Sequence, residues 1–264
     1  MKLNILVTIN KNYLKYLFVM LKSLKENNKK RNIVVYIVAK DIVDNDVNSF
    51  FKKYQMEYQL IEYSDETLDN APTTKRYPSV IYYRLLAAKY LPKNVDKILY
   101  LDPDIIVLKD LNKLYGMEFN EYYFIGSSNV KKVLRKFNEL KNKAPRNSPY
   151  LNTGVLLINV KKLRSIDISN EIYNYILENK NKLFLPDQDI LQGLYGDKVK
   201  QIDNLIYNLS DRTIRMHNLK VNTFKIDEKW VEDNCCIIHY FGKNKPWKDN
   251  YKGILKKFYL TYER

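Results

Sequence analysis

Asp102 and Asp104 lie two residues apart in the run LYLDPDIIV, whose other residues are typical of a buried strand. Aspartate is depleted in strands and is rarely buried without a partner. Pro103 between them has no N–H to donate, so the strand must pause there. The two carboxylates are therefore expected at the end of a strand, where they either bind one divalent cation or act as an acid/base pair.

The metal hypothesis requires further ligands, and carboxylates with one imidazole suit Mn²⁺, with Mg²⁺ as the alternative. The chain has only two histidines, His217 and His239. His239 ends the apolar run CCIIHYF, just before a glycine and the sequence KNKPW. A histidine at the end of a strand is more often structural than a ligand, so these residues alone leave its role open.

Alternating apolar and helix-like segments must position these side chains. Continuous apolar runs, typical of buried strands, alternate with segments of three- and four-residue apolar spacing. The predicted strands span residues 3–9, 33–38, 57–63, 97–101, 152–160 and 235–241. The predicted helices span residues 13–24, 43–54, 79–91 (capped by Ser79), 168–179 and 187–195. This alternation predicts an α/β fold with a parallel sheet between helices, which binds ligands beyond the carboxyl ends of its strands.

The bulk composition, with 45% hydrophobic and 28% charged residues, is typical of a globular protein. We expect one domain over residues 1–264 with a basic, aromatic tail from about 247 to 264. The net charge of +15 suggests a polyanionic neighbour, either nucleic acid, an anionic membrane or a phosphate-bearing substrate. No recognised nucleic-acid motif accompanies it, so we predict no nucleic-acid partner.

The two cysteines, Cys235 and Cys236, are adjacent in a predicted strand. Neighbouring strand residues point to opposite faces, so the pair is expected to remain as free thiols in a reducing compartment. The start of the chain lacks the pattern of a signal peptide, and no run approaches the roughly 20 apolar residues of a membrane span. These features predict a cytoplasmic protein.

Six motifs in one order make a more specific pattern. They are VTINKNYLKYL, YYRL, LYLDPDIIV, YLNTGVLLINV, LPDQDIL and HYFGKNKPW. From residue 3 to about 248 the chain thus resembles glycosyltransferase family 8. The resemblance implies a single GT-A domain and a retaining hexosyltransferase. It also implies UDP-galactose or UDP-glucose as donor, a glycan or glycolipid acceptor, and a role in bacterial surface polysaccharide or glycoprotein glycan synthesis.

The resemblance also implies roles for individual residues. Asp102, Asp104 and His239 would hold Mn²⁺ against the UDP diphosphate, and Gly242 and Lys245 would contact that diphosphate. The uridine would meet Thr8, Asn10 and Tyr13, and the donor sugar would meet Arg84, Asn152 and Asp187, with Gln188 beside the anomeric carbon. Asn10 stands where many relatives have an acidic residue, although its amide can still hydrogen-bond a base edge.

Gln188 is a poor nucleophile, so we expect front-face displacement, in which the acceptor attacks on the side that UDP leaves. Positioning and charge stabilisation by the metal and Lys245 would carry catalysis. A glycosidase that uses Asp102 and Asp104 is the rival enzymatic hypothesis, and a basic nucleic-acid- or membrane-binding protein is the other alternative.

The tail WKDNYKGILKKFYLTYER mixes aromatic and basic residues, as in relatives that touch the membrane carrying their acceptor. Each lysine near an anionic leaflet contributes about 1 kcal/mol of attraction. The tail is therefore expected either to attach the protein to the inner face of the plasma membrane or to pack as a final helix. Residues 64–78 and 129–149 are expected to frame the acceptor site.

Overall fold

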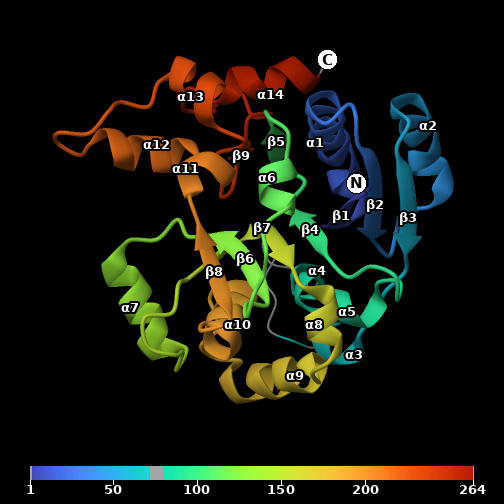
Figure 1. The fold of residues 1–264 in the computed structure, drawn as a ribbon, viewed down its shortest axis with the longest axis vertical. Coiled ribbons are helices and arrows are strands. Elements are labelled where there is room, and N and C mark those ends of the chain that lie inside the picture. Colours follow the sequence, from blue (N-terminus) through green and yellow to red (C-terminus); the bar gives the residue numbers. More distant parts are fainter. Residues whose placement is uncertain (1, 70, 72–79, 264) are drawn as a thin grey trace.

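The computed structural model describes residues 2–69, 71 and 80–263 (Figure 1). A seven-stranded sheet has the order β3-β2-β1-β4-β7-β6-β8, and β5 pairs with β9 in a small second sheet. The strands are β1 (Lys2–Thr8), β2 (Asn32–Val38), β3 (Glu57–Ile61), β4 (Ile98–Leu101), β5 (Ile105–Val107), β6 (Phe124–Ser127), β7 (Asn152–Ile158), β8 (Val199–Ile202) and β9 (Ile237–His239).

The large sheet is mostly parallel, which confirms the predicted fold class. β1 pairs in parallel with β2 and β4, β2 with β3, and β6 with β8. β7 is the exception, because it runs antiparallel to both of its neighbours, β4 and β6. The carboxyl ends of β1 and β4 meet at one edge, where Asp102 follows β4 directly.

Helices cover both faces of this sheet (Figure 1). They are α1 (Leu14–Asn27), α2 (Asp44–Tyr54), α3 (Glu66–Asp69), α4 (Val80–Tyr83), α5 (Ala87–Tyr90), α6 (Asn112–Tyr115), α7 (Lys132–Lys141), α8 (Val160–Arg164), α9 (Ile168–Asn179), α10 (Pro186–Tyr195), α11 (Asn204–Tyr207), α12 (Asp211–Asn218), α13 (Glu228–Asn234) and α14 (Lys256–Glu263). Two 3₁₀ segments, η1 (Lys11–Tyr13) and η2 (Arg84–Leu86), complete them.

The strands are buried on both faces, as their continuous apolar runs predict. In β1, Ile5 packs in the cluster that holds α1 and α2, whereas the next residue, Leu6, packs in the cluster that holds α5, α9 and α10. A third apolar cluster joins β5 and β9 to the C-terminal helix α14. The loops beyond the carboxyl ends are thus held by a rigid two-faced core.

The predicted helix over 79–91 is divided into α4, η2 and α5. Arg84 lies in the 3₁₀ turn, where its Nε donates to the Ile81 carbonyl at 3.0 Å and its Nη1 donates to the Thr153 carbonyl at 3.2 Å. The tighter turn directs the guanidinium inward, which the periodicity of the segment could not show. Ser79, the predicted cap, and most of the predicted 64–78 loop lie outside the described residues.

The C-terminal tail packs on the body of the protein. Trp247 stacks on Tyr16 of α1 with ring centroids 3.7 Å apart, and Phe258 and Tyr259 of α14 are buried. Lys257 pairs with Glu228 and Glu232 of α13 at 2.6 and 2.9 Å. The tail thus packs as a final helix, which was the second of the two alternatives expected from its sequence. Membrane contact by its remaining lysines stays a prediction.

Among the described residues, no helix has the length and apolar character needed to cross a bilayer. Cys235 and Cys236 are both free, as their adjacent positions predicted.

Candidate active site

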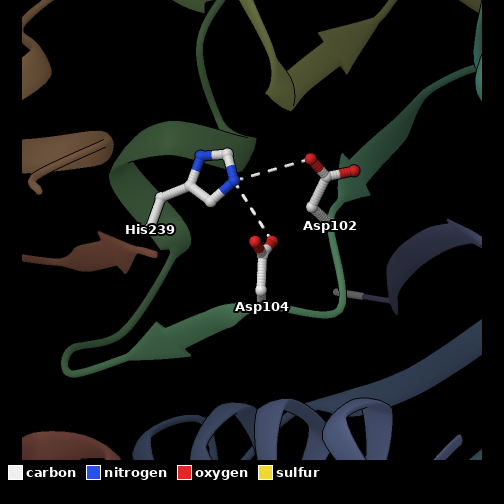
Figure 2. Close-up of side chains that lie close together, drawn as sticks. All are labelled: Asp102, Asp104 and His239. Carbon is white, nitrogen blue, oxygen red and sulfur yellow. Dashed lines mark ion pairs between the residues drawn. The ribbon is translucent and has the colours of Figure 1, made fainter. Parts of the chain in front are cut away.

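Asp102, Asp104 and His239 come together at the junction of the two sheets (Figure 2). The turn between β4 and β5 carries the two carboxylates, and β9 pairs with β5 so that His239 lies opposite Ile105. His239 Nε2 is 3.2 Å from Asp104 Oδ1 and 3.5 Å from Asp102 Oδ2. One ligand atom from each residue lies within 4.8 Å of the other two, a separation that one metal ion can bridge.

A chain of amides fixes the tautomer of His239. The Gly154 backbone N–H donates to Asn152 Oδ1 at 3.2 Å, so this oxygen is an acceptor. Asn208 Nδ2 also donates to Asn152 Oδ1, at 3.0 Å, which turns Asn208 Oδ1 toward His239 Nδ1 at 2.9 Å. Because this oxygen can only accept, Nδ1 carries the proton and the Nε2 lone pair of the neutral ring faces the carboxylates.

The environment of Nε2 fits a divalent cation. This buried nitrogen has no hydrogen-bond partner of good geometry among the described residues. Burial lowers the pKa of His239, but the Asp104 and Asp102 carboxylates outweigh it and raise that pKa to about 8. Either a proton on Nε2 or a cation must balance these charges. Two carboxylates and one imidazole with a second-sphere hydrogen bond form a donor set suited to Mn²⁺ or Mg²⁺.

Two basic side chains stabilise Asp102 and Asp104 in their ionised form. Arg84 is buried, with Nη1 3.1 Å from Asp102 Oδ1 and Nε 3.5 Å from Asp187 Oδ2. Lys245 Nζ contacts Asp104 Oδ2 and donates to the Tyr240 carbonyl at 2.9 Å. Burial raises the pKa of each aspartate, but Arg84 outweighs it at Asp102, as Lys245 and His239 do at Asp104, so both values fall below the usual range.

A cavity of about 1140 Å³ opens beside these residues. Every residue that the sequence analysis assigned to the site lines it, namely Thr8, Asn10, Tyr13, Arg84, Asp102, Asp104, Asn152, Asp187, Gln188, His239, Gly242 and Lys245. The motifs are far apart in the sequence, but the fold places them around one space. The structure thus brings the candidate residues together, while their roles stay predictions.

The network continues from Asp102 to the end of β1. Tyr100 OH donates to Asp102 Oδ1 at 2.7 Å, and Thr8 Oγ1, 3.1 Å from that hydroxyl, donates to it in turn. Asn10 Oδ1 is buried and has no hydrogen-bond partner among the described residues. Beside the half-exposed ring of Tyr13, this end of the cavity offers an acceptor and an aromatic face.

Asp187 and Asp189 of α10 occupy different environments. Asp187 lines the cavity, and its Oδ2 accepts from Thr153 Oγ1 at 2.5 Å. Asp189 is fully buried outside the cavity lining, where it pairs with Lys141 at 2.8 Å and accepts from Tyr150 and Phe184 N. Only Asp187 and Gln188 of this segment are therefore placed to meet a ligand.

Sequence reasoning missed two residues of the site, Gly154 and Asn208. A Cβ atom at Gly154 would overlap His239 Cε1 and lie 2.5 Å from Asp102 Oδ2, so no other residue fits there without displacement. The glycine was visible in the NTG motif, but its closeness to His239 was not. Asn208 follows the short helix α11, in a segment with no pattern that marks a site.

Comparisons with known proteins identify the family of this chain. Residues 4–251 match the family described as glycosyl transferase family 8. Lipopolysaccharide 1,2-glucosyltransferase of Escherichia coli is 29% identical over 250 residues, which cover 91% of this chain and 72% of the relative. Lipopolysaccharide 1,3-galactosyltransferase of Salmonella typhimurium is 24% identical over 254 residues, covering 93% and 73%.

A solved structure shares the fold. The galactosyltransferase LgtC, in complex with donor and acceptor sugar analogs, matches with a TM-score of 0.85 and 23% identity, over 99% of this chain and 95% of the other. The family match spans nearly the whole chain. This protein therefore belongs to glycosyl transferase family 8.

Proposed function

We propose that this protein is a metal-dependent glycosyltransferase that moves a hexose from a UDP-sugar to a hydroxyl group of a glycan or glycolipid. The observation that carries the proposal is the triad of Asp102, Asp104 and His239, with the Nε2 lone pair of the buried His239 directed at two carboxylates on the cavity wall. The relatives named as lipopolysaccharide glucosyl- and galactosyltransferases support a hexose donor and a surface-glycan acceptor.

The nucleotide would occupy the end of the cavity near β1. The buried Asn10 Oδ1 suits the N–H of a uracil base, and the ring of Tyr13 offers a face for stacking. Thr8 lies on the same wall and is linked through Tyr100 to Asp102. The base site and the metal site would therefore form one continuous surface.

The diphosphate would lie against the triad. A divalent cation held by Asp102, Asp104 and His239, Mn²⁺ or alternatively Mg²⁺, would supply Lewis-acid stabilisation of the leaving diphosphate. Lys245 adds a compact positive charge beside Asp104. Gly242 has a φ of 89°, a conformation that favours glycine, and lines the cavity without a side chain, so backbone can approach the phosphates.

The donor sugar would meet Arg84, Asn152, Asp187 and Gln188. Arg84 already bridges Asp102 and Asp187, which orients both carboxylates toward the cavity. Asp189, the other carboxylate of this segment, is buried and fully engaged, and Gln188 is neutral. This arrangement supports retention by front-face displacement rather than through a glycosyl ester on α10.

In that reaction the acceptor oxygen attacks C1 on the face from which UDP departs. The bond between C1 and the β-phosphate oxygen breaks as the new glycosidic C–O bond forms, and the acceptor proton moves to the departing phosphate. Gln188 positions the sugar near C1, and Lys245 stabilises the negative charge that develops on UDP.

A glycosidase that uses Asp102 and Asp104 as its acid/base pair fits this site less well. Such an enzyme needs one carboxylic acid with a raised pKa as proton donor. Here Arg84 and Lys245 pair with Asp102 and Asp104 and lower the pKa of both. Neither group is therefore suited to donate a proton.

We also propose that the described residues form one catalytic domain, because segments from Thr8 to Ile254 line the same cavity. A reducing compartment such as the cytoplasm agrees with the free thiols of Cys235 and Cys236.

The proposal is tested by release of UDP from UDP-glucose and from UDP-galactose, each with Mn²⁺ and with excess chelator. We expect slow release from one of the two donors with Mn²⁺ and none with chelator. NMR should show that the released or transferred sugar keeps the anomeric configuration that it has in the donor. Release that persists in chelator, or inversion at C1, would overturn the proposal.

A further inference from the structure

Helix α7 is inverted relative to an ordinary surface helix, because it turns apolar side chains to the outside. Val133 and Leu140 are 82% and 80% exposed, and Phe137 is 58% exposed. With Leu134 they recur at three- and four-residue spacing, so they form one stripe along the helix. Ordinarily such a stripe faces the core.

The inner face of α7 and of its C-terminal cap is polar. Asn138 and Asn142 are buried, and Asn142 Nδ2 donates to Asp189 Oδ1 and to Gln192 Oε1, each at 3.0 Å. Lys141 Nζ adds an ion pair of 2.8 Å to Asp189. These bonds attach α7 to α10, so the apolar stripe is not used by the fold of the described residues.

The segment around the stripe is strongly basic. Its one acidic residue is Glu139, and its basic residues are Lys131, Lys132, Arg135, Lys136, Lys141, Lys143 and Arg146. An apolar stripe with basic flanks suits the interface of an anionic membrane, where apolar side chains enter the acyl boundary and lysines meet headgroups. A second copy of this chain would bring another +15 of net charge against the same surface, so charge opposes self-association.

We propose that the exposed face of α7 docks on an anionic lipid surface. Phe184 is a further exposed apolar side chain near the C-terminal end of α7, where Lys141 Nζ lies 4.8 Å from its ring centroid. Figure 1 shows α7 at the margin of the molecule, standing out from the sheet. The C-terminal tail is a weaker candidate for this contact, because Phe258 and Tyr259 are buried in the body.

The position of α7 relates the docking surface to the cavity. Asn129 and Val130, which lie just before its N-cap Lys131, line the cavity wall. A protein docked through α7 would therefore hold this wall close to the lipid surface, within reach of a lipid-linked acceptor. That last step rests on the proposed function, whereas docking itself does not depend on any transfer reaction.

The test is co-sedimentation of the full chain with vesicles of phosphatidylcholine, with and without phosphatidylglycerol. At low ionic strength we expect binding only to the vesicles that contain phosphatidylglycerol, with release at high salt. The double substitution Phe137→Ser with Leu140→Ser should weaken partitioning about tenfold or more, and so should Lys132→Glu with Lys136→Glu.

Matched controls remove the same chemistry elsewhere. Val43→Ser with Leu177→Ser deletes two exposed apolar side chains away from α7, and Lys29→Glu with Lys30→Glu makes the same change of charge in the turn after α1. Both should retain most vesicle binding. All variants change exposed residues, so unaltered circular dichroism and thermal melting would show that the fold is kept.

Three results would overturn the proposal. The first is absence of binding to phosphatidylglycerol vesicles by the unmodified chain at low salt. The second is binding that survives both α7 substitutions but is lost in Lys248→Glu with Lys256→Glu, which would assign it to the tail. The third is a dimer in sedimentation velocity that the Phe137→Ser and Leu140→Ser change dissociates, which would make α7 a contact between copies. If the α7 variants bind Mn²⁺ as the unmodified chain does, a negative result for docking does not count against the proposed function.

Discussion

The cavity beside Asp102, Asp104 and His239 and the helix α7 both reverse the usual distribution of residues. The cavity buries Asp104, His239 and Arg84, whereas α7 exposes Val133 and Leu140. In the cavity the reversal is balanced internally, because each carboxylate has a basic partner within the chain. On α7 the described residues do not cover the apolar stripe. Because the charges of the cavity are nearly neutralised, a small ion or ligand is enough to complete it. The apolar stripe, in contrast, can be covered only by an extended surface.

The largest effect should come from Gly154→Ala, because His239 and Asp102 leave no space for a methyl group at this position. A Cβ there would overlap His239 Cε1 and crowd Asp102 Oδ2, so it would displace two of the three proposed ligands at once. We expect Mn²⁺ binding to be lost and UDP release to fall by about 10³-fold or more. Isothermal titration with Mn²⁺ and the UDP assay measure the two effects.

Gly126→Ala is the matched control for that change. Gly126 lies on the neighbouring strand β6, where a Cβ would come no closer than 3.2 Å to the side chains of Leu151 and Leu156 and to the Val155 carbonyl. It should lower stability moderately and leave Mn²⁺ affinity intact. Equal loss of metal binding in both variants would mean that general strain, not the ligands, controls the site.

A pair of isosteric changes separates a ligand from a structural carboxylate. Asp104→Asn should lower Mn²⁺ affinity and UDP release by about 10²- to 10³-fold. Asp189→Asn should instead lower the free energy of unfolding by about 3 kcal/mol, because Asp189 is fully buried and its loss leaves the partly buried charge of Lys141 without its partner.

Chemical denaturation and Mn²⁺ titration on both proteins check this division. If the folded Asp189→Asn protein binds Mn²⁺ poorly, Asp189 contributes to the metal site. An Asp104→Asn protein with full metal affinity would remove Asp104 from the ligand set.

Asn208→Leu should have a smaller effect, because it leaves all three proposed ligands in place. The substitution removes the acceptor of His239 Nδ1–H, so the ring is free to carry its proton on Nε2 instead. We expect a loss of Mn²⁺ affinity of about 10- to 100-fold. The ¹⁵N shifts of His239 should show a mixed tautomer, which a merely structural role for Asn208 would not produce.

Asn179→Leu removes another buried amide, which on α9 donates to the Tyr175 carbonyl at 3.0 Å, and serves as control. It should lower stability without changing the His239 tautomer. If His239 in the Asn208→Leu protein still carries its proton on Nδ1, the hydrogen bonds from Gly154 through Asn152 and Asn208 do not determine the tautomer of His239.

The sequence could predict the sheet and the carboxylates because local patterns determine them. The uninterrupted apolar runs of β1 and β2 identify buried strands, and Pro103 between two aspartates marks the end of another. The order of six motifs then identified further residues of the cavity wall, whereas the lining segments 210–215 and 251–254 lie outside those motifs. Asn208 could not be found in this way, because its role depends on its distance from His239 and Asn152, which are remote in the sequence.

The orientation of α7 was equally hidden. The apolar spacing of Val133, Phe137 and Leu140 would ordinarily indicate the buried face. The fold instead buries Asn138 and Asn142, because the neighbouring helix α10 offers Asp189 and Gln192 rather than apolar side chains. Periodicity shows that a helix has two faces, but the partner decides which of them is inside.

The substitution with the smallest expected effect, Leu140→Ser, tests this inverted burial directly. It is measured by the free energy of unfolding rather than by binding. Leu140→Ser removes an apolar side chain that is 80% exposed, so the free energy of unfolding should change by no more than about 0.5 kcal/mol. Asn142→Leu makes the opposite exchange on the inner side, where it removes the donor of Gln192 Oε1 and one of the three donors of Asp189 Oδ1. That substitution should cost about 2 to 3 kcal/mol despite adding apolar surface. Urea denaturation of the two variants gives both values. If Leu140→Ser destabilises the protein more than Asn142→Leu does, the stripe packs inward in solution, and the docking surface on α7 does not exist.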